Sequence, residues 1–112
     1  MELPDGFLEE IHFDYWVAAL GLSDWTIELT AEPAMEFSGC GSCGINPARR
    51  IAFVRIAHPH SGSDDIEETL VHELLHLYFD IDDMDEKGYR STRMEQGIDH
   101  LSKLLVAFRR SE

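Results

Sequence analysis

The stretch from Thr69 to Tyr78, TLVHELLHLY, constrains the fold most, because it places three polar residues at helical spacing in an otherwise apolar run. On an α-helix, four residues advance about 6 Å and slightly more than one turn, so His72 and His76 project from the same face. That spacing suits two ligands of one tetrahedral metal ion. Glu73, about 100° further round the helix, would flank the metal and could accept a proton from a water held there. The stretch therefore predicts a helix with an H-E-x-x-H zinc site.

Apolar residues surround the three polar side chains on nearly all sides of this helix: Leu70, Val71, Leu74, Leu75, Leu77, Tyr78 and Phe79. A helix that is apolar all round is typically buried. Two histidines and a glutamate on a buried helix need partners, because unpaired polar groups in a core are costly. A metal ion in a cleft supplies those partners. The alternative is three ordinary polar residues on a surface helix.

The length of 112 residues suits one domain, residues 1–112, and the 44% of apolar residues suffices for a core. The formal charge of -13 argues against binding to nucleic acid or to an anionic membrane surface. No apolar run approaches the roughly 20 residues that span a bilayer, and the N-terminus is acidic where a secretory signal is basic. We therefore expect a cytoplasmic protein, and the presence of only two cysteines agrees with a reducing compartment.

The segment before the motif predicts a helix and a small sheet, which together with the motif helix indicate an α+β fold. Residues 5–20 have helical spacing, with Gly21 as the C-terminal stop and His12 and Asp14 in structural positions. The expected apolar face of this helix consists of Leu8, Ile11, Tyr15 and Ala18 or Ala19. Residues 25–30 and 51–57 alternate as strands do, and the glycine- and proline-rich residues 31–48 predict a loop or a loose hairpin.

Acidic residues precede the motif helix. Ser63 or Asp64 is expected to cap it, and Asp64 with Glu67 fits a capping box. We interpret Asp64, Asp65, Glu67 and Glu68 as residues that favour the helix dipole, and expect no catalytic role for them.

Two elements are expected after the motif helix. Residues 80–88 form an acidic loop, for which a solvated loop is a better interpretation than a calcium site. A last helix begins at Ser91 or Thr92, and Arg109 and Arg110 suit its C-terminal end. Its expected apolar stripe comprises Met94, Ile98, Leu101, Leu105 and Phe108.

A catalytic zinc usually has three protein ligands, and Glu95 and Asp99 lie one turn apart near the start of the last helix. The combination of H-E-L-L-H at 72–76 and E-Q-G-I-D at 95–99 resembles the gluzincin branch of the zinc metallopeptidases. This resemblance implies that Glu95 is the third metal ligand and that Asp99 accepts a hydrogen bond from His72. It further implies a minimal zincin-like domain with one Zn²⁺ per chain.

Within that branch, the phrase ETLVHELLHL looks most like short stand-alone metallopeptidase-like proteins of bacteria and phages, related to the SprT-like and ImmA-like groups. The resemblance implies a peptidase that hydrolyses protein or peptide substrates by zinc-activated water, with Glu73 as the general base. The alternative is a latent or non-catalytic binding module that zinc stabilises, such as a phage or prophage regulator.

Small zinc peptidases commonly align a strand with the cleft. Residues 51–57 are the candidate for this strand, with an ordinary core strand as the alternative.

Further polar residues are candidates for secondary roles. Tyr89 and His100 lie near Glu95 in sequence and could stabilise an oxyanion, although both fit structural roles as well. Cys40 and Cys43 form a C-x-x-C pair that could join His58 and His60 in a second, structural metal site. Two reduced thiols in a turn are the default interpretation of the pair.

Overall fold

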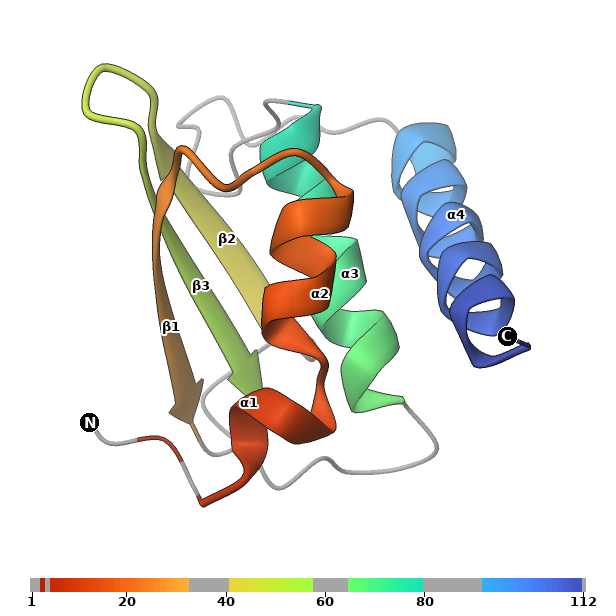
Figure 1. The fold of residues 1–112 in the computed structure, drawn as a ribbon. Coiled ribbons are helices and arrows are strands. Elements are labelled where there is room, and N and C mark those ends of the chain that lie inside the picture. Colours follow the sequence, from red (N-terminus) through yellow and green to blue (C-terminus); the bar gives the residue numbers. More distant parts are fainter. Residues whose placement is uncertain (1–2, 4, 33–40, 58–64, 80–91, 112) are drawn as a thin grey trace.

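The structure is a computed structural model that describes residues 3, 5–32, 41–57, 65–79 and 92–111. Over these ranges the fold is α+β, as the sequence predicts, with four helices and a three-stranded mixed sheet (Figure 1). The elements are α1 (Phe7–Glu10), α2 (Phe13–Ala19), β1 (Thr26–Glu32), β2 (Gly41–Asn46), β3 (Ile51–Ala57), α3 (Ile66–Tyr78) and α4 (Thr92–Arg110). None of the helices so described is long and apolar enough to cross a bilayer.

The single N-terminal helix expected over residues 5–20 is wrong, because the chain forms two short helices with His12 in the left-handed region between them (φ 56°). The break lets Phe7 and Trp16 enter the core, whereas the expected core residues Leu8 and Tyr15 are exposed. Large aromatic side chains gain the most from burial, which accounts for this choice of faces. The predicted stop at Gly21 is confirmed, with φ 71° just after the end of α2.

The sheet has the strand order β1-β3-β2, with β1 parallel and β2 antiparallel to β3. The predicted strand over residues 51–57 is confirmed, and its buried side chains Ala52, Val54 and Ile56 belong to the hydrophobic core. For residues 31–48, expected as a loop or a loose hairpin, the structure shows strand at both described ends: residues 31 and 32 extend β1, and Gly41–Asn46 form β2 in a hairpin with β3. Because β3 is the central strand, its backbone edges are both paired. It is a core strand and cannot itself add an extended substrate.

Helix α3 packs against β2 and β3 with the apolar residues that the sequence places inside, and α2 lies beside it (Figure 1). Leu70, Val71, Leu74, Leu75 and Leu77 are all buried, although Tyr78 and Phe79 at the end of the helix are exposed. The cap lies one residue later than predicted. Asp65 is the N-cap, and its side chain accepts hydrogen bonds from the backbone N–H groups of Glu67 and Glu68.

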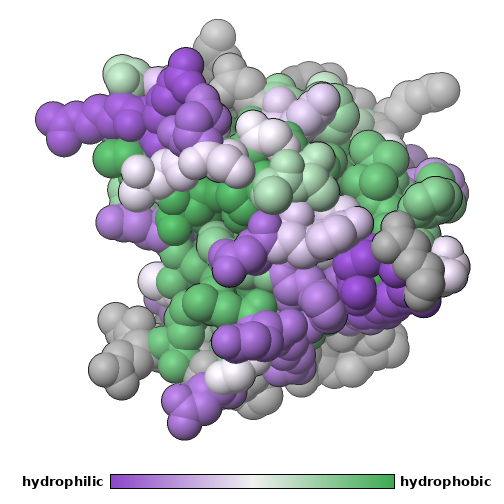
Figure 2. Space-filling model, in the orientation of Figure 1, coloured by the Kyte–Doolittle hydropathy of each residue, from purple (hydrophilic) through white to green (hydrophobic). Residues whose placement is uncertain are grey.

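Helix α4 lies at the margin of the molecule and packs mainly against α3 (Figure 1). Its expected apolar stripe is confirmed for Ile98, Leu101 and Leu105, which lie in the core or pack against it, and is wrong for Met94 and Phe108. The buried residues are Ile98, Ser102 and Val106, whereas Met94 and Phe108 are exposed, Phe108 by 73%. Figure 2 accordingly shows hydrophobic residues on the surface that α4 forms. Among the described elements α3 is the main neighbour of α4, so the buried face is narrower than the apolar content of the sequence suggests.

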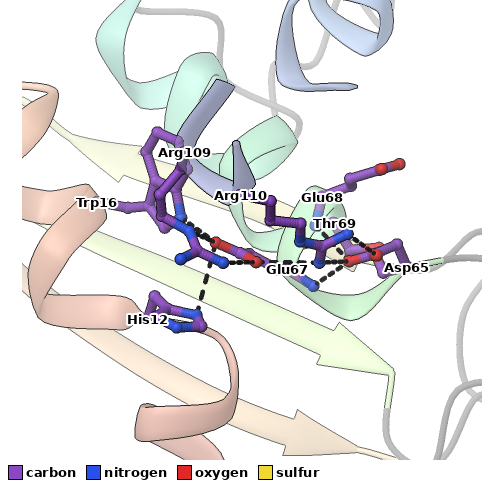
Figure 3. A network of polar contacts seen from close by, with 8 residues as sticks. All are labelled: His12, Trp16, Asp65, Glu67, Glu68, Thr69, Arg109 and Arg110. Carbon is purple, nitrogen blue, oxygen red and sulfur yellow. Dashed lines mark hydrogen bonds and ion pairs between the residues drawn. The ribbon is translucent and has the colours of Figure 1, made fainter. Parts of the chain in front are cut away.

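A buried carboxylate links α3 to α4 and α2 (Figure 3). Glu67, only 1% exposed, accepts hydrogen bonds from Arg109 Nε (2.6 Å) and Nη2 (2.8 Å), from Arg110 Nη2 (3.0 Å) and from Trp16 Nε1 (2.7 Å). Arg110 also pairs with Asp65 at 2.8 Å, and His12 Nδ1 lies 3.6 Å from Glu67 Oε2. Glu67 is therefore an interhelical ion-pair partner as well as a residue of the first helical turn.

The ion pairs set the ionisation of Glu67. Burial raises the pKa of its carboxyl group, but hydrogen bonds from Arg109, Trp16 and Arg110 outweigh burial and hold the pKa below its ordinary value. A hydrogen bond from Arg110 is the main cause that lowers the pKa of Asp65. The network is therefore built around ionised carboxylates.

The free energy of unfolding should decrease as the pH falls below about 4.3, the ordinary pKa of glutamate. Because the folded-state pKa of Glu67 is lowered, its contribution is complete above the ordinary pKa and is lost as the pH falls through the folded-state pKa. Thermal unfolding followed by circular dichroism between about pH 3 and pH 7 measures this dependence. The dependence should be shallower in Glu67→Gln, and an equal slope in both proteins would contradict the assignment.

Candidate metal centre

His72, His76 and Glu95 come together between α3 and α4. His72 Nε2 lies 3.1 Å from Glu95 Oε2, and His76 Nε2 lies 3.0 Å from Glu95 Oε1. The two imidazole rings stack with centroids 5.1 Å apart and planes at 30°. Potential ligand atoms from the three residues all lie within 4.8 Å of one another. The two histidines therefore lie on the same face of α3, as their spacing predicts, and α4 places Glu95 beside both rings.

The donor set fits a divalent metal such as zinc. Two neutral imidazoles and one carboxylate are a common protein ligand set for catalytic zinc. Ligands about 2.1 Å from a tetrahedral ion stand roughly 3.4 Å apart, and each histidine Nε2 lies slightly closer than this to one oxygen of Glu95. Among the residues with described placement, no other group of three or more His, Cys, Asp or Glu side chains meets the same distance criterion.

Asp99 lies next to His72, on the side opposite the cluster. Its Oδ1 is 3.7 Å from His72 Nδ1, and its Oδ2 pairs with Lys103 Nζ at 3.0 Å. The distance to His72 exceeds a hydrogen bond, so the predicted bond is not formed in this arrangement. A small movement would allow Asp99 to accept the Nδ1 proton and orient Nε2 toward the cluster.

Glu73 is buried, with 5% of its surface exposed, and lies against the first residue of β2. A Cβ atom added at Gly41 would stand 3.2 Å from both Cγ and Oε2 of Glu73, and 2.8 Å from the backbone oxygen of Arg55. The chain therefore needs glycine at position 41 for β2 to approach both β3 and this carboxylate. Gly41 fixes how closely the edge strand approaches Glu73.

Gly41→Ala should destabilise the fold by about 1–3 kcal/mol, because the new methyl group overlaps a backbone atom that cannot rotate away. Chemical denaturation measures the change. Gly97→Ala is the matched control. Gly97 lies on α4, and a Cβ atom added there would meet nothing within 4 Å. That control should be neutral or stabilising by up to about 1 kcal/mol. Equal effects of the two substitutions would contradict the close packing at position 41.

The other predicted residues are placed as follows. His100 is exposed and follows Glu95 by five residues on α4, which puts the two side chains about 140° apart on the helix. This orientation argues against the oxyanion role for His100. Cys43 is fully buried in β2. Tyr89, Cys40, His58, His60 and the acidic loop 80–88 lie outside the described residues, so the oxyanion role of Tyr89 and the second metal site stay predictions.

Sequence reasoning missed the roles of Glu67 and Gly41. A usable signal existed for Glu67, because it precedes Leu70, Val71 and Leu74 by three, four and seven residues and so shares their buried face. A carboxylate in that position requires a cation, and Arg109 and Arg110 are candidates on the last helix. No comparable signal existed for Gly41, whose requirement arises from strand pairing.

The arrangement joins two imidazoles and a carboxylate at one point, with a second, buried carboxylate on the neighbouring residue of the same helix. In comparisons with known proteins, no family model, no curated protein and no solved structure matches this chain.

Proposed function

We propose that the chain is a zinc-dependent peptidase with a minimal zincin-like fold. One observation carries the proposal: His72 and His76 from α3 and Glu95 from α4 converge with ligand atoms within 4.8 Å. A third ligand that lies 19 positions or more from the two histidines and yet reaches both is the arrangement that a three-ligand metal site requires. The proposed substrate is a protein or a peptide.

Each polar residue then has a defined task. His72, His76 and Glu95 would hold the zinc, and Asp99, after a small movement toward His72, would orient this ring through its Nδ1 atom. Zinc when bound lowers the pKa of water and polarises a peptide carbonyl. Glu73 accepts the proton from the attacking water and transfers it to the leaving amine. Burial of Glu73 keeps bulk water from competing for that proton.

Two features near the cluster could receive a peptide. β2 is an edge strand that packs beside α3, so an extended segment could add to its outer edge by main-chain hydrogen bonds. An apolar hollow of about 380 Å³ lies between the end of α3 and α4, lined by Phe79, Met94, Gly97, Ile98 and Leu101. Phe79 and Ile98 each follow a cluster residue by three positions. We therefore propose substrates with a large apolar side chain near the cleaved bond.

A second candidate is a latent or non-catalytic binding module in which zinc holds α3 and α4 together. The burial of His76 (1% exposed) and Glu73 favours it, because a cleaving site must admit a peptide carbonyl. In that case His76→Ala should lower the melting temperature, while Glu73→Gln should leave every function unchanged. A regulator of phage or prophage type would belong to this class.

Native mass spectrometry of the untagged protein tests the metal site. We expect one zinc per chain, lost in Glu95→Ala because two histidines alone bind the ion weakly. Glu28→Ala, which removes an exposed carboxylate on β1, is the matched control and should retain zinc. Absence of zinc from the wild type, even after zinc is supplied, would overturn the proposal. Two zinc ions would support the additional site at Cys40, Cys43, His58 and His60.

A further inference from the structure

The cluster is divided between two helices, so it exists only while α4 is docked against α3. His72 and His76 belong to α3, and Glu95 belongs to the first turn of α4. Any rotation or sliding of α4 moves the carboxylate away from both imidazoles. What sets the position of α4 therefore also sets the geometry of the candidate metal site.

The docking face of α4 is polar at both ends and apolar only in the middle. Glu95, Ser102 and Arg109 recur every seven residues and so lie on one side of the helix, with the buried Ile98 and Val106 between them. Ile98, Ser102 and Val106 offer little apolar surface. The larger apolar residues Met94, Leu104 and Phe108 are exposed. Leu101 and Leu105 also pack against the core but are only partly buried, so the polar contacts at both ends of the face add to what apolar packing fixes.

At the far end of the docking face, Arg109 contacts Glu67 with two parallel hydrogen bonds, from Nε to Oε2 and from Nη2 to Oε1. A fork of this kind fixes direction as well as distance, because both groups are planar. Trp16 on α2 donates to the same carboxylate and limits its rotation (Figure 3). Arg110 adds a bond to Glu67 and one to Asp65, the cap of α3.

The fork and the cluster lie on the same side of α4. Glu95 and Arg109 are two heptads apart, about 21 Å along the helix and within about 40° in rotation. α3 and α4 run antiparallel, with the start of each helix bound to the end of the other. A helix held at both ends of its docking face has a defined rotation and axial position.

We propose that the Glu67–Arg109 pair is a positioning device for the metal site, which sets the rotation and axial position of α4 and so holds Glu95 at His72 and His76. This proposal rests on the proposed function, because it concerns the same metal site. Loss of the fork should weaken metal binding in a protein that remains folded, although neither residue touches the ion.

Titration with Co²⁺ in place of zinc tests the proposal, because visible absorption reports both the affinity and the coordination geometry. Arg109→Lys keeps the charge but replaces the fork by a single point contact. It should weaken Co²⁺ binding by about tenfold, as changes to residues that orient ligands do, and it should alter the absorption bands. Arg50→Lys is the matched control. It makes the same change in the exposed Arg50–Asp24 ion pair and should leave affinity and spectrum unchanged.

A folded Arg109→Lys protein with wild-type affinity and spectrum would overturn the positioning role alone. If Arg109→Lys does not fold, Arg110→Ala decides, since Arg110 is half exposed and its loss removes one bond to Glu67. Unchanged Co²⁺ binding in that variant would equally overturn the role. Failure of the wild type to bind Co²⁺ would overturn the proposed function, and this inference with it. Melting temperatures do not enter the decision, because a purely structural pair would change them too.

Discussion

Glu73→Gln is expected to retain zinc and to lose hydrolysis by about a hundredfold to ten-thousandfold. Glu73 follows His72 directly, so it projects about 100° from the histidine on the helix, and the proposed function gives it the role of base beside the metal ligands. The amide of glutamine cannot accept a proton, and general bases contribute about this factor to hydrolytic rates. Cleavage of a broad peptide mixture, followed by mass spectrometry, measures the loss.

Glu68→Gln is the matched control for this substitution. Glu68 lies on the same helix, five residues earlier, and pairs with no member of the cluster in the described structure, so the control should keep the wild-type rate. A Glu73→Gln variant that cleaves as fast as the wild type would exclude Glu73 as the base. A wild type that binds zinc but cleaves nothing in the mixture would favour the binding module.

The part of the site that is local in sequence could be predicted, because helix geometry alone determines it. Residues four apart on α3 share a face whatever the rest of the chain does, so His72 and His76 lie together as expected. Glu95 could not be placed by spacing, since its approach depends on how α4 packs. Its assignment as a ligand came from a resemblance to a family and stays a prediction, while the structure places Glu95 beside both histidines.

The orientation of α4 could not be predicted, because its sequence contains two candidate faces. The middle of the expected stripe packs against the core, but its ends Met94 and Phe108 are exposed. Ser102 and Val106, on the flank of the stripe, are buried. Periodicity reports that a helix is amphipathic, but it does not report how much of the apolar surface a neighbour covers. The ion pairs at the C-terminal end of the helix contribute to the choice of face, and they join residues more than 40 positions apart.

The break at His12 escaped prediction for a related reason. A continuous helix through residues 5–20 would satisfy local spacing, with Leu8, Ile11 and Tyr15 on one face. The folded chain buries Ile11 as expected, but it buries Phe7 and Trp16, nine residues apart on either side of the break, in place of Leu8 and Tyr15. The indole N–H of Trp16 is satisfied by Glu67 on α3. Tertiary contacts thus overrode local helical periodicity.

Glu67→Ala is expected to destabilise the protein by about 3–5 kcal/mol, because it leaves Arg109 and the indole N–H of Trp16 without their buried acceptor. Domains of this size are stable by only about 5–15 kcal/mol, so the loss is a large share of the total. The melting temperature should fall by more than about 10 °C. Asp24→Ala breaks the exposed pair with Arg50 and should cost less than about 1 kcal/mol. Similar melting temperatures for the two variants would show that burial adds nothing to the Glu67 network, and apolar packing would then be the main contact that holds α4.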